Sequence, residues 1–432
     1  MHTLNRWQHS SMWLLTILFF LSAGLRAQTV KQLTLEEARQ LARNNYPLMR
    51  QKELISKTAG ITIENLQKAF LPQVSLSGQA TYQSEVTQVK IPVPGVTIDP
   101  LSKDQYKLVA DINQVIYDGG TANQQKNLQQ LNATVEQQKI EVELYKLTER
   151  ISQLYVGILF LEEQLKQSGL VKTDIANGIK KVQAQVTNGV AFRSNLSLLQ
   201  AELLKTEQRV IEINASRKGL LLALGLLVNQ NLPSDIQLQM PVPGNTNEEK
   251  DDIKRPELLL FSSQDKYLSS QVKLVDAKNL PRASLFLQSG YGRPGLNFLK
   301  NEFAFYYLGG IRLNWSFNGL YTQKKEKELV ELNRRSVDIQ KETFLLNTRT
   351  ALGQQKAEMD KLQELINTDN AIILLRVTVK EAAKAQLDNG VITANDYLRE
   401  VTAEDQARQS LIAHQLQLLQ AQINYKNISG NQ

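Results

Sequence analysis

The sequence predicts a mainly α-helical fold with a smaller β part, in two tandem repeats that each hold a strand pair and a long helical hairpin. Two observations support this prediction: one set of residues occurs twice, and proline is confined to two windows. Seven residues recur 209 positions later: Pro47, Leu71, Pro72, Ser75, Leu76, Gln79 and Tyr82 become Pro256, Leu280, Pro281, Ser284, Leu285, Gln288 and Tyr291. Further on, Gln185, Asn188, Gly189 and Val190 recur after 201 positions as Gln386, Asn389, Gly390 and Val391. Each half therefore supplies the same structural unit.

Residues 1–27, before the first repeat, have the pattern of a cleaved secretory signal peptide. A lone Arg6 precedes a short apolar run from Met12 to Leu21, and the segment ends in the small residue Ala27. The run is shorter than the roughly 20 residues that a membrane-spanning helix needs. We expect residues 28–230 to form the first repeat, residues 231–254 a proline-rich and acidic linker, and residues 255–432 the second repeat.

Each repeat is expected to begin with a helix, followed by a pair of strands over residues 72–117 and 281–317. In these segments apolar and polar residues alternate with the period of two that gives a strand one apolar and one polar face. Strands of this length can cross a bilayer at a tilt. The alternative is a soluble β-sandwich, but two hairpins are too few for one. The residues expected to face lipid are Val74, Leu76, Leu285, Ile311, Leu313 and Trp315.

The proline distribution predicts that very long helices follow each strand pair. All 11 prolines lie between positions 47 and 100 or between 233 and 294, so residues 101–232 and 295–432 contain none. Proline lacks the N–H that a helix interior requires. At 1.5 Å per residue, a helix from 121 to 185 would span about 100 Å, a length that calls for a coiled-coil partner.

Two short turns break the proline-free tracts and predict that each long helix folds back on itself. Asn-Gly is a strong turn signal, because both residues tolerate a positive φ. Ser194 or Asn195 would cap the returning helix of the first repeat, and Asn395 or Asp396 that of the second. Helical hairpins are therefore expected over 121–230 and 320–428. The turn residues are Asn188, Gly189, Val190 and Ala191 in the first hairpin and Asn389, Gly390, Val391 and Ile392 in the second.

The composition argues against an enzyme and against a metal or cofactor site. There is no cysteine, so the chain has neither thiolate ligands nor a thiol nucleophile. Of its three histidines, His2 and His9 would leave with the signal peptide, and His414 would remain. Metal sites and acid–base sites rely heavily on histidine. The formal charge of +7 is spread over helices that interleave both signs, which predicts a solvated surface and no nucleic-acid partner.

Four strands per chain cannot close a membrane barrel, and an open edge cannot face lipid. The smallest membrane barrels have about eight strands. We therefore expect copies of the chain to pool their strands. Three copies would make a homotrimer with a 12-stranded β-barrel, whose polar strand faces line a wet bore above a cylinder of helical hairpins.

The order of these motifs resembles the TolC-like outer-membrane efflux protein family over essentially the whole mature chain. The resemblance rests on the Leu-Pro-x-x-Ser-Leu strands, the strand ends Tyr117-Asp118-Gly119-Gly120 and Phe317-Asn318-Gly319, the Asn-Gly turns, and residues 222–226 (Leu-Ala-Leu-Gly-Leu). It implies a homotrimeric channel-tunnel in the outer membrane of a Gram-negative bacterium, in contact with outer-membrane lipid and extending into the periplasm. The missing cysteine argues against a lipid anchor. The implied partners are a periplasmic adaptor and an inner-membrane pump of RND or ABC type, for efflux or type I secretion.

The resemblance also implies where the functional residues lie. Asp396 falls on the first acidic position of the family's periplasmic gate, next to Asn395, and Arg399 replaces a frequent second acid. An Arg399–Asp396 pair could brace the closed end; alternatively, Asp396 is only a helix cap. The eight turn residues named above would form the adaptor-docking tips. An adaptor-type coiled-coil protein is the alternative function, although an adaptor would not carry two strand pairs. The cargo stays open among drugs, metals, polysaccharide and polypeptide.

Overall fold

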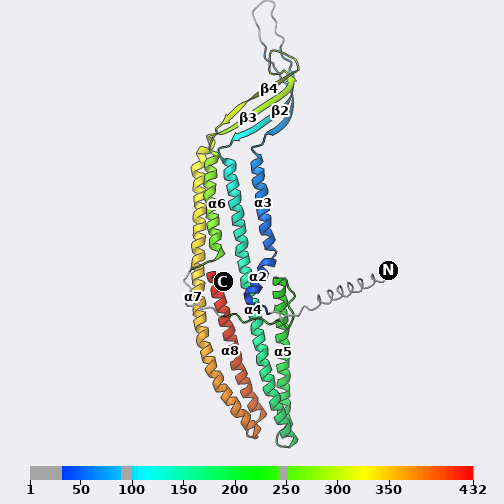
Figure 1. Cartoon of the computed structure of the whole chain (residues 1–432), viewed down its shortest axis with the longest axis vertical. Helices are drawn as coiled ribbons and strands as arrows, with labels where there is room; N and C mark the ends of the chain where they lie inside the picture. The colour runs from blue at the N-terminus through cyan, green and yellow to red at the C-terminus, as the bar shows by residue number, and fades with distance from the viewer. Residues whose placement is uncertain (1–31, 89–99, 243–251, 432) are drawn as a thin grey trace, which may run out of the picture. The chain divides into compact units, whose positions relative to one another are not determined.

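The computed structural model describes residues 32–88, 100–242 and 252–431, so the predicted signal peptide over 1–27 lies outside the described residues. The described chain is mostly helical, and its strands form one antiparallel sheet in the order β1-β2-β3-β4 (Figure 1). The predicted fold class, long helical hairpins with a small β part, is confirmed. The elements are α2 (Leu35–Asn45), α3 (Leu48–Lys68), β1 (Gln73–Tyr82), β2 (Asp104–Tyr117), α4 (Thr121–Thr187), α5 (Arg193–Val228), α6 (Pro256–Lys278), β3 (Arg282–Arg293), β4 (Ala304–Asn314), α7 (Asn318–Asp388) and α8 (Ala394–Ser429).

The segment before β1 differs from its prediction, because it forms two helices where one was expected. Tyr46 ends α2 with an extended backbone, at φ −68° and ψ 132°, and Pro47 follows it. A proline disfavours the helical conformation for the residue before it, which accounts for the break. In the second repeat the equivalent Pro256 is the first residue of α6, a position that proline tolerates, and α6 is continuous.

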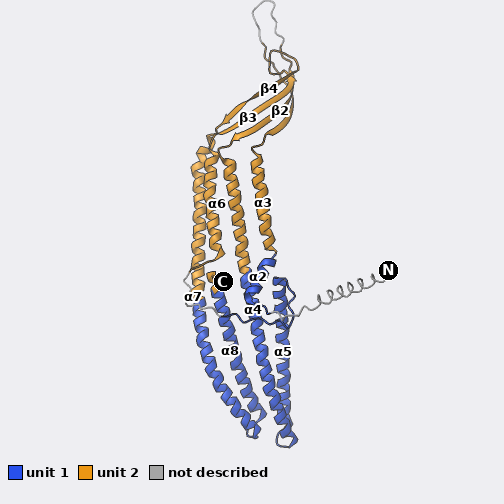
Figure 2. Ribbon diagram, viewed as in Figure 1, with its two compact units in different colours: residues 1–46, 147–250, 355–425 blue, residues 47–146, 251–354, 426–432 orange. Residues whose placement is uncertain are grey.

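The chain divides into two compact units (Figure 2). Unit 1 comprises residues 1–46, 147–250 and 355–425, and unit 2 comprises residues 47–146, 251–354 and 426–432. Both units contain parts of both repeats. The reason is that equivalent elements of the two repeats pack together. In unit 2, for example, β2 of the first repeat pairs with β3 of the second.

The larger hydrophobic core of unit 1 joins α2, α4, α5 and α8. Its centre is Tyr155, which is fully buried and whose hydroxyl lies 2.7 Å from the carbonyl oxygens of both Leu33 and Gln239. Burial raises the pKa of this phenol. Ile236 and Leu238 belong to the same core, so the beginning of the predicted linker over 231–254 is packed against the helices. Residues 243–251 of that linker lie outside the described part.

The strand hairpins of unit 2 repeat each other in register. Val74 of β1 lies opposite Ile112 of β2, and Ala283 of β3 lies opposite Leu313 of β4. These pairs are related by the same shifts, 209 for the first strand and 201 for the second, that relate the sequence motifs. The duplication therefore extends to the pairing of individual residues.

Candidate functional site

The strand register gathers the apolar side chains of the sheet on one face. Residues directly opposite each other in antiparallel strands point to the same face, and alternate residues point to opposite faces. Val74, Leu76, Leu285, Ile311 and Leu313, predicted to face lipid, all lie on this face and are 44 to 74 % exposed. They share it with Leu108, Ile112, Leu287, Tyr291, Phe305 and Tyr307.

The opposite face of the sheet is mainly polar, although Val109, Phe286 and Leu308 lie on it. It carries Ser75, Asp111 and Gln288 at one level, and the Gln288 amide donates a 2.8 Å hydrogen bond to the Asp111 carboxylate. Arg312 lies on this face too, with its guanidinium carbon 4.7 Å from the centre of the Phe286 ring. The sheet thus has a wide exposed apolar surface on one side and a polar surface on the other.

Trp315, the sixth residue predicted to face lipid, lies just beyond the end of β4. Its indole N–H donates a 3.0 Å hydrogen bond to the carbonyl of Asn279, and its ring centre lies 4.8 Å from that of Phe317. An aromatic pair with a satisfied polar edge suits the boundary between an apolar and a wet region. Trp315 thus lies outside the paired strand, with its indole bonded to the backbone that follows α6.

The two hairpin turns have the same backbone geometry. Gly189 and Gly390 both have φ +72°, and their N–H groups bond to the carbonyls of Val186 and Leu387. The next residues, Val190 and Val391, donate to carbonyls five positions back at 2.9 and 2.8 Å. This is the Schellman arrangement that ends many helices with glycine in the left-handed conformation. Only the glycines have a positive φ here; Asn188 and Asn389 do not, contrary to the sequence interpretation.

The tips expose apolar side chains, although not all of the predicted ones. Val190 and Val391 are 75 and 71 % exposed. Ala191 and Ile392 are half-buried, and Ile392 packs against the smaller core of unit 1. Sequence reasoning missed Phe192, which is 79 % exposed beside Val190. Its repeat equivalent is the polar Thr393, so a comparison of the two repeats could have found it.

The cap of α8 is Thr393, which corrects the prediction of Asn395 or Asp396. The Thr393 hydroxyl lies 3.3 Å from the backbone nitrogen of Asp396, and the Asp396 carboxylate accepts from the Thr393 N–H at 3.1 Å and from its hydroxyl at 2.7 Å. This reciprocal arrangement is a capping box with aspartate as its acid. The hydrogen bonds from Thr393, with a smaller contribution from the charge of Arg399, lower the pKa of Asp396.

Arg399 pairs with a different acid from the one expected. Its Nε lies 3.2 Å from the Glu400 carboxylate, which Arg376 of α7 also approaches at 3.6 Å. The sequence suggested that Arg399 and Asp396 brace the start of α8. In the structure Thr393 and Asp396 make that contact instead. Arg399 stays 74 % exposed, and Asn395 is exposed as well.

Behind the tips, a mostly buried ion cluster that sequence reasoning missed joins three helices of unit 1. Lys380 of α7 lies 2.6 Å from Glu404 of α8 and 2.9 Å from Asp174 of α4, and Arg408 lies 2.6 Å from Glu404. The Glu404 and Lys380 side chains are 5 and 11 % exposed. Burial alone would lower the pKa of Lys380 and raise that of Glu404, but the ion pairs outweigh burial and shift both pKa values in the opposite directions.

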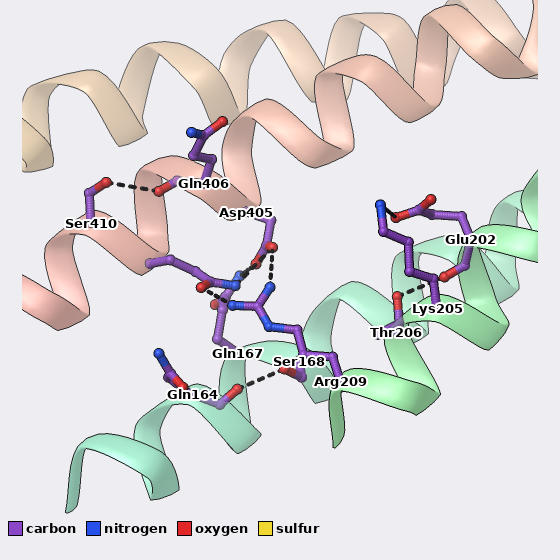
Figure 3. A network of polar contacts seen from close by, with 11 residues as sticks. Gln164, Gln167, Ser168, Glu202, Lys205, Thr206, Arg209, Asp405, Gln406 and Ser410 are labelled. Atoms are coloured by element: carbon purple, nitrogen blue, oxygen red, sulfur yellow. Dashed lines mark hydrogen bonds and ion pairs between the residues drawn. The ribbon is translucent and has the colours of Figure 1, made fainter. Parts of the chain in front are cut away.

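A buried tyrosine and a polar cluster complete the contacts between the hairpins. Tyr397 is 2 % exposed, burial raises its pKa to about 12, and a Cβ on Gly178 would lie 3.2 Å from its ring. Farther along α8, Asp405 accepts from Gln167 of α4 at 3.0 Å and pairs with Arg209 of α5 at 3.4 Å (Figure 3). The two hairpins are thus held together along their length by both apolar packing and polar side chains.

Comparison with known proteins identifies the fold. No family model matches the chain, and no curated protein matches its sequence. Among solved structures, the outer-membrane channel OprN matches with TM-score 0.68 and 14 % identity, covering 92 % of this chain and 90 % of its own. CusC, studied for transmembrane channel formation, matches with TM-score 0.67, 13 % identity and 92 % coverage of both chains. The open-state MtrE outer-membrane channel of Neisseria gonorrhoeae matches with TM-score 0.64 and 14 % identity, covering 92 % of this chain and 89 % of its own.

None of the helices in the described segments has the length and apolar composition of a membrane-spanning helix. The structural matches extend over nine-tenths of the chain, and they include both the helical hairpins and the four-stranded sheet. The low identities mean that the likeness is one of fold. The chain has the fold of the TolC-like outer-membrane channels, as the order of its duplicated motifs predicted.

Proposed function

We propose that this chain is the outer-membrane channel-tunnel of a tripartite efflux or type I secretion system, a passive conduit with no catalytic activity. The observation that carries the proposal is the sheet, which has one exposed apolar face and one polar face. An apolar face of this extent suits lipid, and a polar face suits a wet bore. The periplasmic-adaptor alternative gains no support, because every structural match named above is a membrane channel.

The open edges of the sheet support assembly with copies of the same chain. β1 and β4 each pair on one side only, and they run antiparallel to each other within the sheet. Two such edges from neighbouring copies would therefore meet as antiparallel partners. A homotrimer would close a barrel of twelve strands in contact with outer-membrane lipid and leave no edge.

The internal repeat predicts the register of that inter-copy pairing. Within the chain, Ala110 of β2 lies opposite Ser289 of β3, where the first repeat joins the second. Shifting these residues by 201 and 209 positions gives Ile311 of β4 and Ala80 of β1. The same construction pairs Ser316 with Ser75 of the next copy. It also explains why β4 ends at Asn314, the equivalent of Asn113, whereas β2 continues four residues further to Tyr117. The residues after Asn314 have no partner strand within one chain.

Cysteine cross-linking tests both the assembly and its register, and the absence of natural cysteine removes any background. An Ala80→Cys/Ile311→Cys variant should form covalent dimers and trimers in the outer-membrane fraction on oxidation. A control variant, Leu76→Cys/Ile311→Cys, places the partners four residues out of register, about 13 Å apart along the strand, and should not cross-link. A soluble monomer, with neither variant cross-linked, would refute the proposed function.

We further propose that the hairpin tips form the periplasmic end of the tunnel, with Asp396, Asn395 and Arg399 at its gate. Three copies of Asp396 near one axis would repel each other, and its depressed pKa keeps the carboxylate charged at neutral pH. Asp396→Ala should then change single-channel conductance and cation block in planar bilayers, and Arg399→Ala should raise the open fraction. If both variants conduct like the parent, the constriction lies elsewhere.

The exposed tips are the proposed contact for a periplasmic adaptor, through which an RND or ABC pump would deliver cargo. Val190, Val391 and Phe192 expose apolar surface at the end of a highly polar bundle, which favours a protein contact. Phe192→Ser should abolish adaptor capture while the trimer still assembles. The matched control is Leu226→Ser, which removes an equally exposed apolar side chain, 83 % accessible, near the other end of α5. Equal capture of the adaptor by the wild type, Phe192→Ser and Leu226→Ser would contradict a docking role for Phe192.

A further inference from the structure

Three cations gather at one end of the sheet, on its polar side. Lys278 is the last residue of α6, Arg282 is the first of β3, and Arg312 lies on β4. They line one groove of about 410 Å³ in unit 2. Polar side chains of the neighbouring strands complete its wall: Asn113, Ser284, Asn314 and Ser316. We call Lys278, Arg282, Arg312 and this wall the basic groove.

The basic groove carries a net positive charge within the described residues, with three cations against the single acid Asp118. None of its three cations takes part in an ion pair there. The acid beside them, Asp118, is engaged elsewhere: it accepts hydrogen bonds from the backbone N–H groups of Gly120 at 2.8 Å and Ala122 at 2.6 Å. Arg312 rests against the Phe286 ring, which holds its position by cation–π attraction and leaves its N–H groups available to a ligand.

The first repeat shows that the fold does not require this charge. At the positions equivalent to Lys278, Arg282 and Arg312 it carries Ala69, Gln73 and Asp111. The presence of Lys278 has a structural reason, because it ends α6 and a cation stabilises a helix C-terminus. That reason does not apply to Arg282 and Arg312, which lie in strands. The nearest acid on the polar face is Asp111, which lies opposite Gln288 of β3. Arg312 lies opposite Ser284, four residues along β3 from Gln288, so Arg312 and Asp111 are about 13 Å apart along the strand direction.

We propose that the basic groove is an anion-binding site on the channel wall, which recognises carboxylate, phosphate or sulfate groups of passing solutes and favours anions in conduction. The inference rests on the proposed function, because the polar face lines a bore only in the closed barrel. Each copy contributes one groove, so the assembled channel carries a ring of them at one level. Rings of charged side chains select ions by sign in other channels, and guanidinium groups suit planar oxyanions.

The test compares ion selectivity in planar bilayers under a KCl gradient. The variant K278Q/R282Q/R312Q removes three charges from the basic groove. The matched control K139Q/K146Q/K361Q removes three exposed lysines that each pair with a glutamate three residues before them on a helix. We expect the chloride-to-potassium permeability ratio to fall at least about twofold in the groove variant and to stay unchanged in the control. The difference should shrink in 1 M salt, where the Debye length is about 3 Å.

Inorganic tripolyphosphate serves as a second probe, because it should reduce the current of the wild-type and control channels but not of the groove variant. A groove variant with the wild-type permeability ratio and the same tripolyphosphate block would overturn this inference while leaving the channel function intact. A wild-type protein that forms no channel would overturn both. The variant R312D, which copies Asp111 of the first repeat, should lower the ratio further than R312Q, and the opposite order would also contradict the proposal.

Discussion

Replacing Lys380 with isoleucine should loosen the contact between α7 and α8 behind the hairpin tips. The substitution removes the ammonium that lies 2.6 Å from Glu404 and 2.9 Å from Asp174, but leaves the carboxylates in place. The first repeat suggests the replacement, because the residues equivalent to Lys380 and Glu404 are Ile179 and Leu203, which pack against the smaller core of unit 1. The site can therefore hold either an ion pair or two apolar side chains.

The burial of the pair sets the size of the effect. Removing one partner of a buried ion pair costs about 3–5 kcal/mol, because the other charge stays buried without compensation. Glu404 is only 5 % exposed, but Arg408 still contacts it at 2.6 Å. We therefore expect the lower end, about 3 kcal/mol, which corresponds to an opening equilibrium shifted by about 100-fold. Lys380→Ile/Glu404→Leu should recover most of this loss, because an apolar pair can replace a buried ion pair at little cost.

Amide hydrogen exchange along α7 and α8 is the suitable assay, because it reports local opening in a protein with two compact units. Lys361→Ile is the control: its exposed pair with Glu358 is worth about 0.5 kcal/mol or less. In the wild type the pKa of Glu404 is depressed. The ion pairs of Glu404 therefore stabilise the folded state at neutral pH, and this stabilisation is lost as the pH falls through that pKa. The deficit of Lys380→Ile should therefore shrink on acidification. Unchanged exchange in Lys380→Ile, or a double variant worse than the single one, would refute the reasoning.

Three further substitutions test the sheet, the turns and the larger core. Ile311→Arg should block barrel assembly at a cost of about 2–4 kcal/mol per copy near the bilayer centre, whereas Ser75→Arg on the polar face, opposite Asp111, should assemble normally, as measured by the fraction of cross-linked trimer on gels. Gly390→Ala, at φ +72°, should destabilise its tip by about 1 kcal/mol in thermal unfolding, whereas Gly353→Ala, in open space on α7, should stabilise the protein slightly. Tyr155→Phe should lower stability by about 1–3 kcal/mol, because the single hydroxyl proton shared by the carbonyls of Leu33 and Gln239 is lost, although the Leu33 carbonyl still accepts from the Gln239 N–H.

The parts of the structure that follow from local periodicity could be read from the sequence. Alternation in 72–117 and 281–317 predicted the strands and the faces they present, because the period of two assigns each side chain to a face without knowledge of its partner. The glycines of the turns were equally informative, since only a residue without Cβ adopts φ +72° at no cost. The shifts of 209 and 201 residues then carried the elements from α3 to α5 of the first repeat into the second.

The contacts between distant segments could not be predicted in this way. Lys380 and Asp174 are 206 positions apart, and their pairing depends on how α4 packs against α7, which helical periodicity does not specify. The cap of α8 was misplaced for a different reason: Thr393, Asn395 and Asp396 are all good capping residues, and the choice among them depends on where the preceding turn ends. The three cations of the basic groove and Phe192 escaped notice because their repeat equivalents are not cationic or aromatic.

The differences between the repeats are therefore the most informative positions about function. Where both repeats carry the same residue, as at Gly189 and Gly390, the shared geometry of the fold is a sufficient explanation. Where they differ, as at Lys380 and Ile179, the fold accepts either residue. Thr393 caps its helix and Phe192, at the same place, does not, although both helices form. The uncapped tip lacks this hydrogen bond and exposes an aromatic ring, which supports the proposed adaptor contact at Phe192.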